Sequence, residues 1–308
     1  MTGELCIIGH EKSDSNLKLL EEAKKAFSTV FFVPITGINI GLKDRFTIAY
    51  RTTDLLKFKA ILPRIPRAFS SYAYKLLSLF PEDTYMSIKP ISFLLATERF
   101  FLLTVLRKRG IETINLRLTQ AKDSAYRIIE ENSFPLIVRT PEKKTGVFVK
   151  NGTEAKSIID TLISLKHPVL IEDTVKELVS VYVAEPDIIA CVKKKTKEKD
   201  LVFASGEIKS CKIDLETQHL ALDTARAIEA QNARIDIALG GKPRIVGVDL
   251  NPNLISPSRA TGVDIPKKLI ESLKANFKAH REKPMLMKFF EDAGSVVKDV
   301  LKTKQLIF

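Results

Sequence analysis

The chain of 308 residues is long enough for roughly two domains, and hydrophobic side chains make up 45% of it, so its composition excludes a disordered chain. Its 49 Lys and Arg against 37 Asp and Glu give a formal net charge of +12, which favours anionic partners such as nucleotides, nucleic acid or acidic peptides. No apolar run approaches the roughly 20 residues that cross a membrane, and the N-terminus lacks the pattern of a secretory signal. We therefore expect a cytoplasmic protein with no membrane partner.

The N-terminal part of the chain combines short apolar runs with one helical pattern. These patterns predict a strand over residues 4–9, a helix over 15–27, and three further strands over 29–33, 46–50 and 60–64. Strand, helix and strand in this order are typical of a parallel sheet covered by helices. We expect an N-terminal α/β domain over 1–88, without a dinucleotide site because no GxGxxG follows the first strand.

A second region mixes helices with short strands. A helix is predicted over 91–110, because three basic residues and then Gly110 mark its C-terminal end. A compact α+β unit follows, and we expect it to form a small subdomain over about 121–172. Its predicted elements are helices over 124–132 and 154–165 and strands over 136–139, 147–149 and 169–171.

The remaining segments predict a C-terminal α+β subdomain over about 173–280, which completes a larger domain over 89–280. Its predicted elements are a hairpin of strands 178–184 and 188–192, a helix over 217–230, and strands 235–239 and 244–250. Beyond Pro284, apolar residues recur at helical spacing and predict an amphipathic helix over 284–304. This helix packs either on its own domain or against a partner, such as a second copy of the chain in a homo-oligomer.

Three cysteines, Cys6, Cys191 and Cys211, are too few and too scattered for a metal centre. None belongs to a CxxC motif or stands beside a histidine at metal-ligand spacing. We interpret them as buried thiols in a reducing compartment.

Four stretches in chain order resemble the RimK-like branch of the ATP-grasp ligases. They are Tyr50-Arg51 with FKAILPRI at 58–65, the segment 98–111 from Glu98-Arg99 to RKRGI, FPLIVR at 134–139, and VDLN at 248–251 with ATGVDI at 260–265. The resemblance covers about residues 4–275. It implies an α/β protein with the ATP-grasp fold: an N-terminal parallel-sheet pre-ATP-grasp domain, a small α+β nucleotide subdomain and a C-terminal α+β subdomain.

The same resemblance implies an activity. Such enzymes are ATP-dependent carboxylate–amine ligases, which activate a carboxylate as an acyl phosphate that an amine then attacks. This chain would join an amino acid such as glutamate to a protein, carrier or coenzyme carboxylate, using ATP and Mg²⁺, or Mn²⁺ in its place. ATP, the amino acid and the carboxylate acceptor would be its partners, and the resemblance identifies no catalytic side chain.

Two carboxylates and an amide form the candidate metal site. Asp236 and Asp249 fall on neighbouring predicted strands joined by a Gly-Gly turn, and Asn251 follows Asp249 by two residues, which places it on the same face. Mg²⁺ prefers such hard oxygen ligands, and the set resembles the metal triad of the family. The alternative is that the two aspartates only cap strand ends.

The resemblance also implies a set of cofactor-binding residues. Two arginines occupy positions where the family carries lysines that bind phosphate, and a lysine-rich turn with a single glycine takes the place of the glycine-rich loop. The segment after the strand 169–171 would hold the adenosine. The complete set is Arg99, Arg139, Lys143, Lys144, Gly146, Glu172, Asp173, Thr174 and Val175.

Other departures favour a second interpretation. Leu178 and Ser180 replace an Asp-x-Arg of the family, and the phosphate loop has lost glycines, so the chain could be a degenerate, non-catalytic ATP-grasp protein. It would then bind a nucleotide or an anionic macromolecule such as RNA or the ribosome. Five lysines within 193–199 are either a solvated loop or an arm that contacts such a polyanion.

Overall fold

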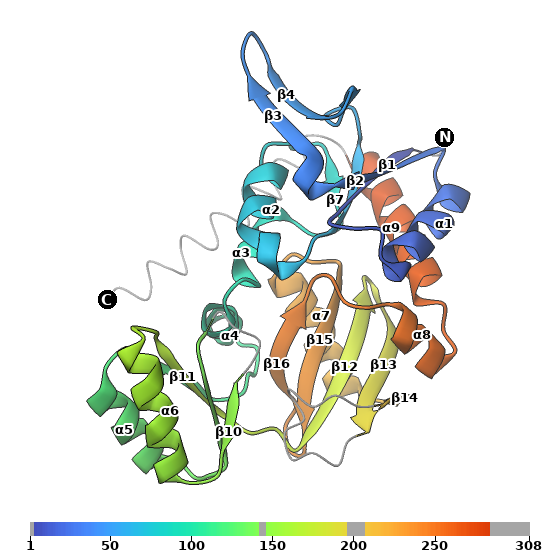
Figure 1. Cartoon of the computed structure of the whole chain (residues 1–308). Helices are drawn as coiled ribbons and strands as arrows, with labels where there is room; N and C mark the ends of the chain where they lie inside the picture. The colour runs from blue at the N-terminus through green and yellow to red at the C-terminus, as the bar shows by residue number, and fades with distance from the viewer. Residues whose placement is uncertain (1–2, 142–145, 196–206, 284–308) are drawn as a thin grey trace.

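The computed structural model describes residues 3–141, 146–195 and 207–283, which form three bodies (Figure 1). An N-terminal domain stands above a large sheet, and a small subdomain with two helices on its outer side lies beside that sheet (Figure 1). The predicted helix over 284–304 lies outside the described residues. Within the described part of the chain, no helix is both long and apolar enough to span a membrane.

The N-terminal domain is built on a parallel sheet in the order β2-β1-β6-β7, as its continuous apolar runs predict. Its strands are β1 (Glu4–Gly9), β2 (Thr29–Pro34), β6 (Ala60–Arg64) and β7 (Tyr85–Met86). Side chains alternate between its two faces. Cys6 and Ile8 pack towards α2 (Ser70–Leu77) and α3 (Pro90–Leu95), whereas Leu5 and Ile7 pack towards α1 (Asp14–Ala26).

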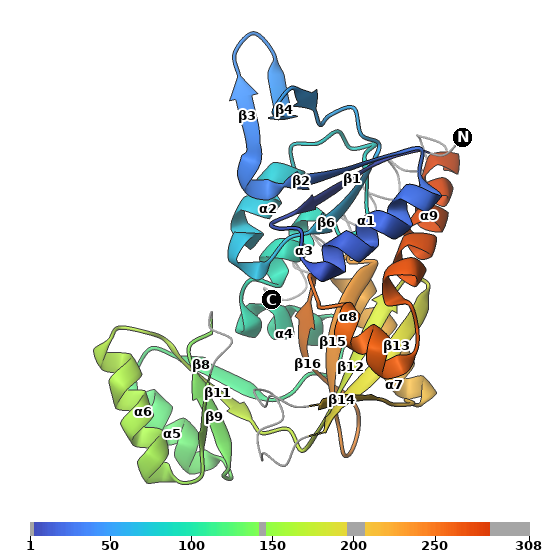
Figure 2. The same cartoon turned by 45° about the vertical axis from the view of Figure 1, so that its right-hand side comes forward.

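The C-terminal helix of the described chain returns to this domain. In Figure 2, α9 (Ile265–Glu282) runs beside α1, although the two helices are far apart in sequence. Leu269, Leu273 and Phe277 of α9 share a buried cluster with Leu19 and Ala23 of α1. The N-terminal domain therefore depends on the far end of the chain for the cover of one sheet face.

The strand predicted over 46–50 does not join the parallel sheet. It is β4 (Phe46–Tyr50), which pairs antiparallel with β3 (Ile38–Leu42) and β5 (Thr53–Asp54) in a hairpin that projects from the domain (Figure 1). Its register joins Leu42 to Phe46. So short a connection permits an antiparallel hairpin only, because a parallel pair needs a crossover of roughly a dozen residues. The prediction of a parallel strand here was wrong.

The helix predicted over 91–110 is broken into α3 and α4 (Arg99–Lys108). Glu98 caps the second helix, because its carboxylate accepts hydrogen bonds from the backbone N–H groups of Phe100 at 2.6 Å and Phe101 at 2.8 Å. Apolar periodicity continues through the break, so the sequence pattern hides it. The restart places Arg99 in the first turn of α4.

The small subdomain has an antiparallel sheet in the order β10-β9-β11-β8, covered by two helices. Ala125 and Ile129 of one helix and Ala155 and Ile159 of the other pack on Val138. The elements are β8 (Leu116–Thr119), α5 (Lys122–Glu131), β9 (Leu136–Arg139), β10 (Val147–Val149), α6 (Gly152–Ser164) and β11 (Val169–Asp173).

We expect Asn151→Ala to lower the free energy of unfolding by about 1 kcal/mol, because Asn151 is the N-cap of α6. Its side-chain oxygen accepts a hydrogen bond from the N–H of Glu154 at 2.9 Å, and the Glu154 carboxylate accepts one from the N–H of Lys150 at 2.8 Å. Urea denaturation measures the change, and Asn151→Asp, which keeps the acceptor, is the control. Equal loss in both variants would contradict the capping role.

The large sheet is antiparallel, in the order β14-β13-β12-β15-β16. Val181 and Ile235 point to one face, where Ala221 and Ala225 of α7 (Leu215–Ala227) cover them. The opposite face holds polar side chains, described below. The other elements are β12 (Glu177–Ala184), β13 (Asp187–Lys195), β14 (Glu207–Ser210), β15 (Asn232–Leu239), β16 (Arg244–Asp249) and α8 (Ile255–Thr261).

Candidate functional site

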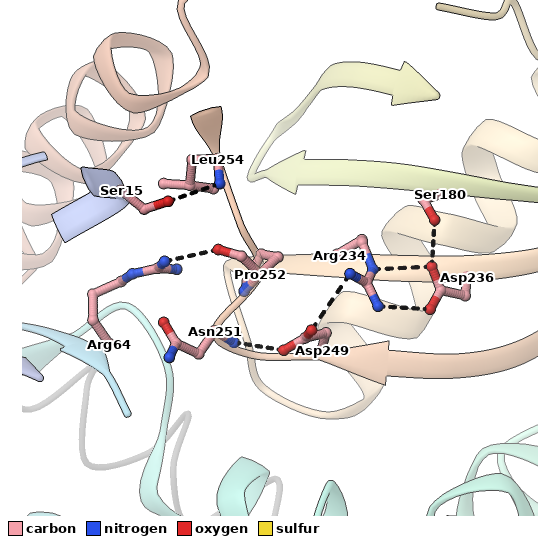
Figure 3. A network of polar contacts seen from close by, with 9 residues as sticks. All are labelled: Ser15, Arg64, Ser180, Arg234, Asp236, Asp249, Asn251, Pro252 and Leu254. Carbon is pink, nitrogen blue, oxygen red and sulfur yellow. Dashed lines mark hydrogen bonds and ion pairs between the residues drawn. The ribbon is translucent and has the colours of Figure 1, made fainter. Parts of the chain in front are cut away.

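Four polar residues lie together on the face of the large sheet that α7 leaves uncovered (Figure 3). The strand register places Ser180 opposite Asp236 and Arg234 opposite Asp249. Arg234 and Asp236 are two residues apart on β15, so their side chains share a face. Tertiary pairing of β12, β15 and β16 thus brings the two predicted metal-binding aspartates close to a guanidinium that the sequence analysis missed.

Arg234 bridges the two carboxylates. Its Nε and Nη2 donate to the two oxygens of Asp236 at 3.0 Å each, and its Nη1 lies 3.5 Å from Oδ2 of Asp249. Ser180 Oγ donates to Asp236 at 2.6 Å. Burial lowers the pKa of Arg234, but the charges of Asp236 and Asp249 outweigh it, so the net pKa is raised. The guanidinium therefore remains charged and neutralises one of the two carboxylates.

The chain after β16 connects this cluster to the N-terminal domain (Figure 3). Asp249 accepts a hydrogen bond from the N–H of Asn251 at 3.0 Å. Pro252 then accepts one through its carbonyl from Nη2 of Arg64, at 2.8 Å. Arg64, at the end of β6, is 2% exposed, and burial lowers its pKa to about 10 against the opposing charge of Asp249. A second buried guanidinium thus lies near Asp249. In the sequence, only the position of Arg64 in the PRI part of the stretch 58–65 pointed to this residue.

The donor atoms suit a divalent cation. Two carboxylates and an amide supply the hard oxygens that Mg²⁺ binds. Asp249 and Asn251 also line a cavity of about 30 Å³ between β16 and the N-terminal domain, which is large enough for a single ion or water. On these two counts Asp249 and Asn251 fit Mg²⁺. Asp236 is not among the residues that line this cavity, and both of its carboxylate oxygens already accept hydrogen bonds from Arg234 or Ser180.

A second cluster joins the small subdomain to α4. Arg99 donates through Nε and Nη2 to the two carboxylate oxygens of Glu172, at 2.8 and 2.9 Å. Arg139, at the end of β9, donates through Nε to Oε1 of Glu172 at 2.7 Å. The side chain of Glu172 is 0% exposed and those of Arg99 and Arg139 are 11% and 3% exposed. One buried carboxylate therefore holds both predicted phosphate-binding arginines.

This arginine pair carries surplus positive charge. Burial lowers the pKa of Arg139, the charge of Glu172 opposes that shift, and the nearby charges of Arg99 and Arg67 lower the pKa further. Arg99 and Arg139 thus share the carboxylate of Glu172, and the charge of Arg67 also acts on Arg139. Such a surplus favours an anionic ligand.

The two clusters meet at β16. A Cβ added to Gly247 would lie 3.1 Å from Nη1 of Arg99. Residues two apart on a strand point to the same face, so Asp249 points to the face of β16 on which Arg99 lies. The predicted phosphate-binding and metal-binding residues, which come from different parts of the chain, are therefore neighbours across one strand.

The residues predicted to hold the adenosine lie around the end of β11. Asp173 accepts a hydrogen bond from Nδ2 of Asn115 at 2.8 Å, and Thr174 donates to the carbonyl of Pro135 at 3.3 Å. Val175 is buried. Asn115, Glu172 and Asp173 line a cavity of about 360 Å³, within the usual range for small-molecule sites. Glu172 contacts the arginines, so Asp173 is the more accessible of the two acidic residues.

The lysine-rich turn can be placed only in part. Gly146, half-buried, lies next to β10, while Lys143 and Lys144 lie outside the described residues. Of the run 193–199, the first three lysines continue β13, where Lys193 is exposed, and residues 196–199 lie outside the described part.

Comparison with known proteins identifies the family of this chain. Residues 96–273, more than half of the chain, match the RimK-like ATP-grasp domain. The chain belongs to this family. Within it, the ribosomal protein bS6–L-glutamate ligase of Escherichia coli O81 (strain ED1a) is 24% identical in an alignment of 237 positions that covers 73% of this chain and 79% of that enzyme. The resemblance inferred from the sequence motifs is confirmed.

Solved structures of other ATP-grasp ligases share the fold. The ligase PsnB, complexed with a phosphomimetic variant of its minimal precursor, Mg and ADP, has a TM-score of 0.72 at 15% identity, covering 89% of this chain and 98% of its own. The D-alanine–D-alanine ligase from Bacillus anthracis, complexed with ATP, has a TM-score of 0.65 at 15% identity, covering 92% and 100%. The predicted α/β ATP-grasp fold of this RimK-like protein is confirmed.

Proposed function

We propose that this RimK-like protein is an ATP-dependent carboxylate–amine ligase that joins an amino acid, such as glutamate, to a carboxylate of a protein, carrier or coenzyme. The observation that carries the proposal is the meeting of two clusters at β16. Arg99 approaches Gly247, and Asp249 points to the same face two residues later. A triphosphate needs cationic side chains and a metal ion side by side, and this face brings cationic side chains next to the proposed metal ligands.

Each cluster would perform one part of the reaction. Arg99 and Arg139 would bind phosphate oxygens, and Glu172 would hold the two guanidinium groups in place between the subdomains. Asp236, Asp249 and Asn251 would hold Mg²⁺ or Mn²⁺, which supplies charge neutralisation for the phosphates when bound.

The adenosine would occupy the cavity at the end of β11, where Asp173 offers an acceptor for the ribose hydroxyls. Lys143, Lys144 and Gly146 complete the proposed phosphate-binding set, and Thr174 and Val175 complete the adenosine-binding segment. A carboxylate of the acceptor would be phosphorylated next to Asp249, and the amine of the incoming amino acid would then displace the phosphate.

The family relative acts on the ribosomal protein bS6 and L-glutamate, as its name states, so glutamate and a polypeptide acceptor are the first substrates to test. We expect ADP release from Mg-ATP that requires both the amino acid and the acceptor, detected by coupled assay, with a matching mass increase of the acceptor. Background ADP release that neither substrate raises, across a panel of amino acids and acidic peptides, would refute the ligase proposal.

A non-catalytic protein is the second candidate, and the contacts of Asp236 favour it. Both oxygens of this carboxylate are already engaged, by Arg234 and Ser180. A protein of this kind would bind nucleotide, or RNA through its basic surface, without ligation. Calorimetric titration separates the candidates: micromolar binding of Mg-ATP that needs the metal supports the ligase, whereas metal-independent nucleotide binding or RNA binding alone supports the second candidate.

A further inference from the structure

Two of the three cysteines form a pair at the edge of the large sheet, where the proposed ligase reaction does not use them. Sγ of Cys191 on β13 and Sγ of Cys211, just after β14, are 2.8 Å apart. Cys6 and Cys191 are buried, as predicted, but Cys211 is half-exposed, which corrects the prediction of three buried thiols. Since the cysteines are 20 residues apart in sequence, only the pairing of these strands brings them together.

The backbone at this pair already has the geometry of a cross-strand link. The register pairs Val192 with Ser210, so Cys191 and Cys211 are the next opposed residues, and the N–H of Cys211 donates to the carbonyl of Cys191 at 3.1 Å. Opposed residues in an antiparallel pair have Cα atoms roughly 4.5–5.5 Å apart, within the range that a disulfide requires. Closing the gap to a bond of about 2.05 Å therefore needs only a small movement of the side chains.

The two thiols differ in pKa and in exposure, and stepwise oxidation requires such a difference between the attacking and the resolving thiol. The hydrogen bond from Cys191 lowers the pKa of the Cys211 thiol, burial opposes this shift, and the charge of Lys193 reinforces it. The same hydrogen bond and burial raise the pKa of Cys191. Cys211 is thus the accessible thiol that forms a thiolate first, and Cys191 stands behind it as the resolving thiol. Cys6 is isolated on β1, and burial raises its pKa to about 12.

We propose that Cys191 and Cys211 form a reversible disulfide, with oxidised glutathione or a similar small disulfide as the oxidant. The Cys211 thiolate attacks one sulfur of the oxidant, breaks its S–S bond and releases one glutathione thiolate. Cys191 transfers its proton to that thiolate and attacks the sulfur of Cys211, which releases the second glutathione. The two protein thiols are oxidised, and one disulfide is reduced to two glutathione molecules. The bond would fasten the edge strand β14 to β13.

The test uses the full chain in buffers of increasing ratio of oxidised to reduced glutathione. Remaining thiols are alkylated after acid quenching and unfolding, and tryptic peptides are analysed by mass spectrometry. We expect a single linked peptide pair that joins Cys191 to Cys211, reversed by dithiothreitol, while Cys6 stays alkylatable in the same molecules. Both cysteines remaining alkylatable at the highest ratio, or linked instead to Cys6 or to another chain, would overturn the proposal.

Serine variants assign the two roles. Cys191→Ser should stop at a stable mixed disulfide between Cys211 and glutathione, because the resolving thiol is absent. Cys211→Ser should leave Cys191 unmodified over the same period, and Cys6→Ser, the matched control, should form the disulfide as the unmodified chain does. Faster reaction of Cys191 than of Cys211 in these variants would overturn the assignment of Cys211 as the attacking thiol.

Discussion

Glu172→Gln should lower the free energy of unfolding by about 3–5 kcal/mol, the cost of removing one partner from a buried ion pair. The variant keeps the size of the side chain and loses its charge. Arg99 and Arg139, at 11% and 3% exposure, would then be left without the carboxylate to which they donate. Because Glu172 lies on β11 and Arg99 on α4, the loss should also loosen the small subdomain from the rest of the protein.

Chemical denaturation followed by circular dichroism measures this loss. Glu131→Gln is the matched control, since Glu131 forms an ion pair with Arg117 at 3.4 Å in which both side chains are more than half exposed. We expect the control to change stability by no more than about 1 kcal/mol. If Glu172→Gln were equally mild, the buried pair would not hold the subdomains together.

Asp249→Asn should reduce ATP-dependent ligation by about 10²–10³-fold, because a neutral amide replaces a carboxylate at the proposed metal site and several kcal/mol of charge stabilisation are lost. The side chain of Asp249 is only partly buried, and Arg234 retains its paired contact with Asp236. We therefore expect the variant to fold. Its requirement for Mg²⁺ should shift to higher concentration, which distinguishes a lost ligand from a general loss of activity.

Initial rates over a range of Mg²⁺ concentrations measure both effects. Asp223→Asn makes the same chemical change on α7, in an exposed ion pair with Arg226, and should leave the rate within about twofold. An Asp249→Asn variant with the rate and metal dependence of this control would show that the aspartate merely ends a strand, the alternative that the sequence left open.

Much of the fold could be predicted from local patterns. The apolar runs that become β1 and β6 are buried on both faces, and such runs indicate a parallel sheet by themselves, whereas β2 at the sheet edge is only partly buried. The motifs at 134–139 and 248–251 identified the family without any structure. The spacing of Asp249 and Asn251 predicted one shared strand face, but β16 ends at Asp249 and Asn251 lies in the chain beyond it. Each of these conclusions rests on residues close together in sequence.

Predictions from local patterns were wrong where one sequence pattern is compatible with two different structures. The apolar run 46–50 suits a parallel or an antiparallel strand, and the short connection to β3 decided for the hairpin. Helical periodicity runs through Glu98, but the capping bonds of its carboxylate end one helix and begin another.

By itself, therefore, the sequence determined the family, many of the elements in their order and the residues proposed for the candidate site, but it did not predict β3, α2, α8 or α9. Only the tertiary structure decided how the site residues contact one another. Glu172 meets Arg99 across 73 residues of sequence, and Arg234 meets Asp249 because β15 pairs with β16 in one register. A buried charge needs a counterion because water no longer solvates it. Which residue becomes that counterion depends on how whole subdomains pack, and this packing cannot be read from spacing along the chain.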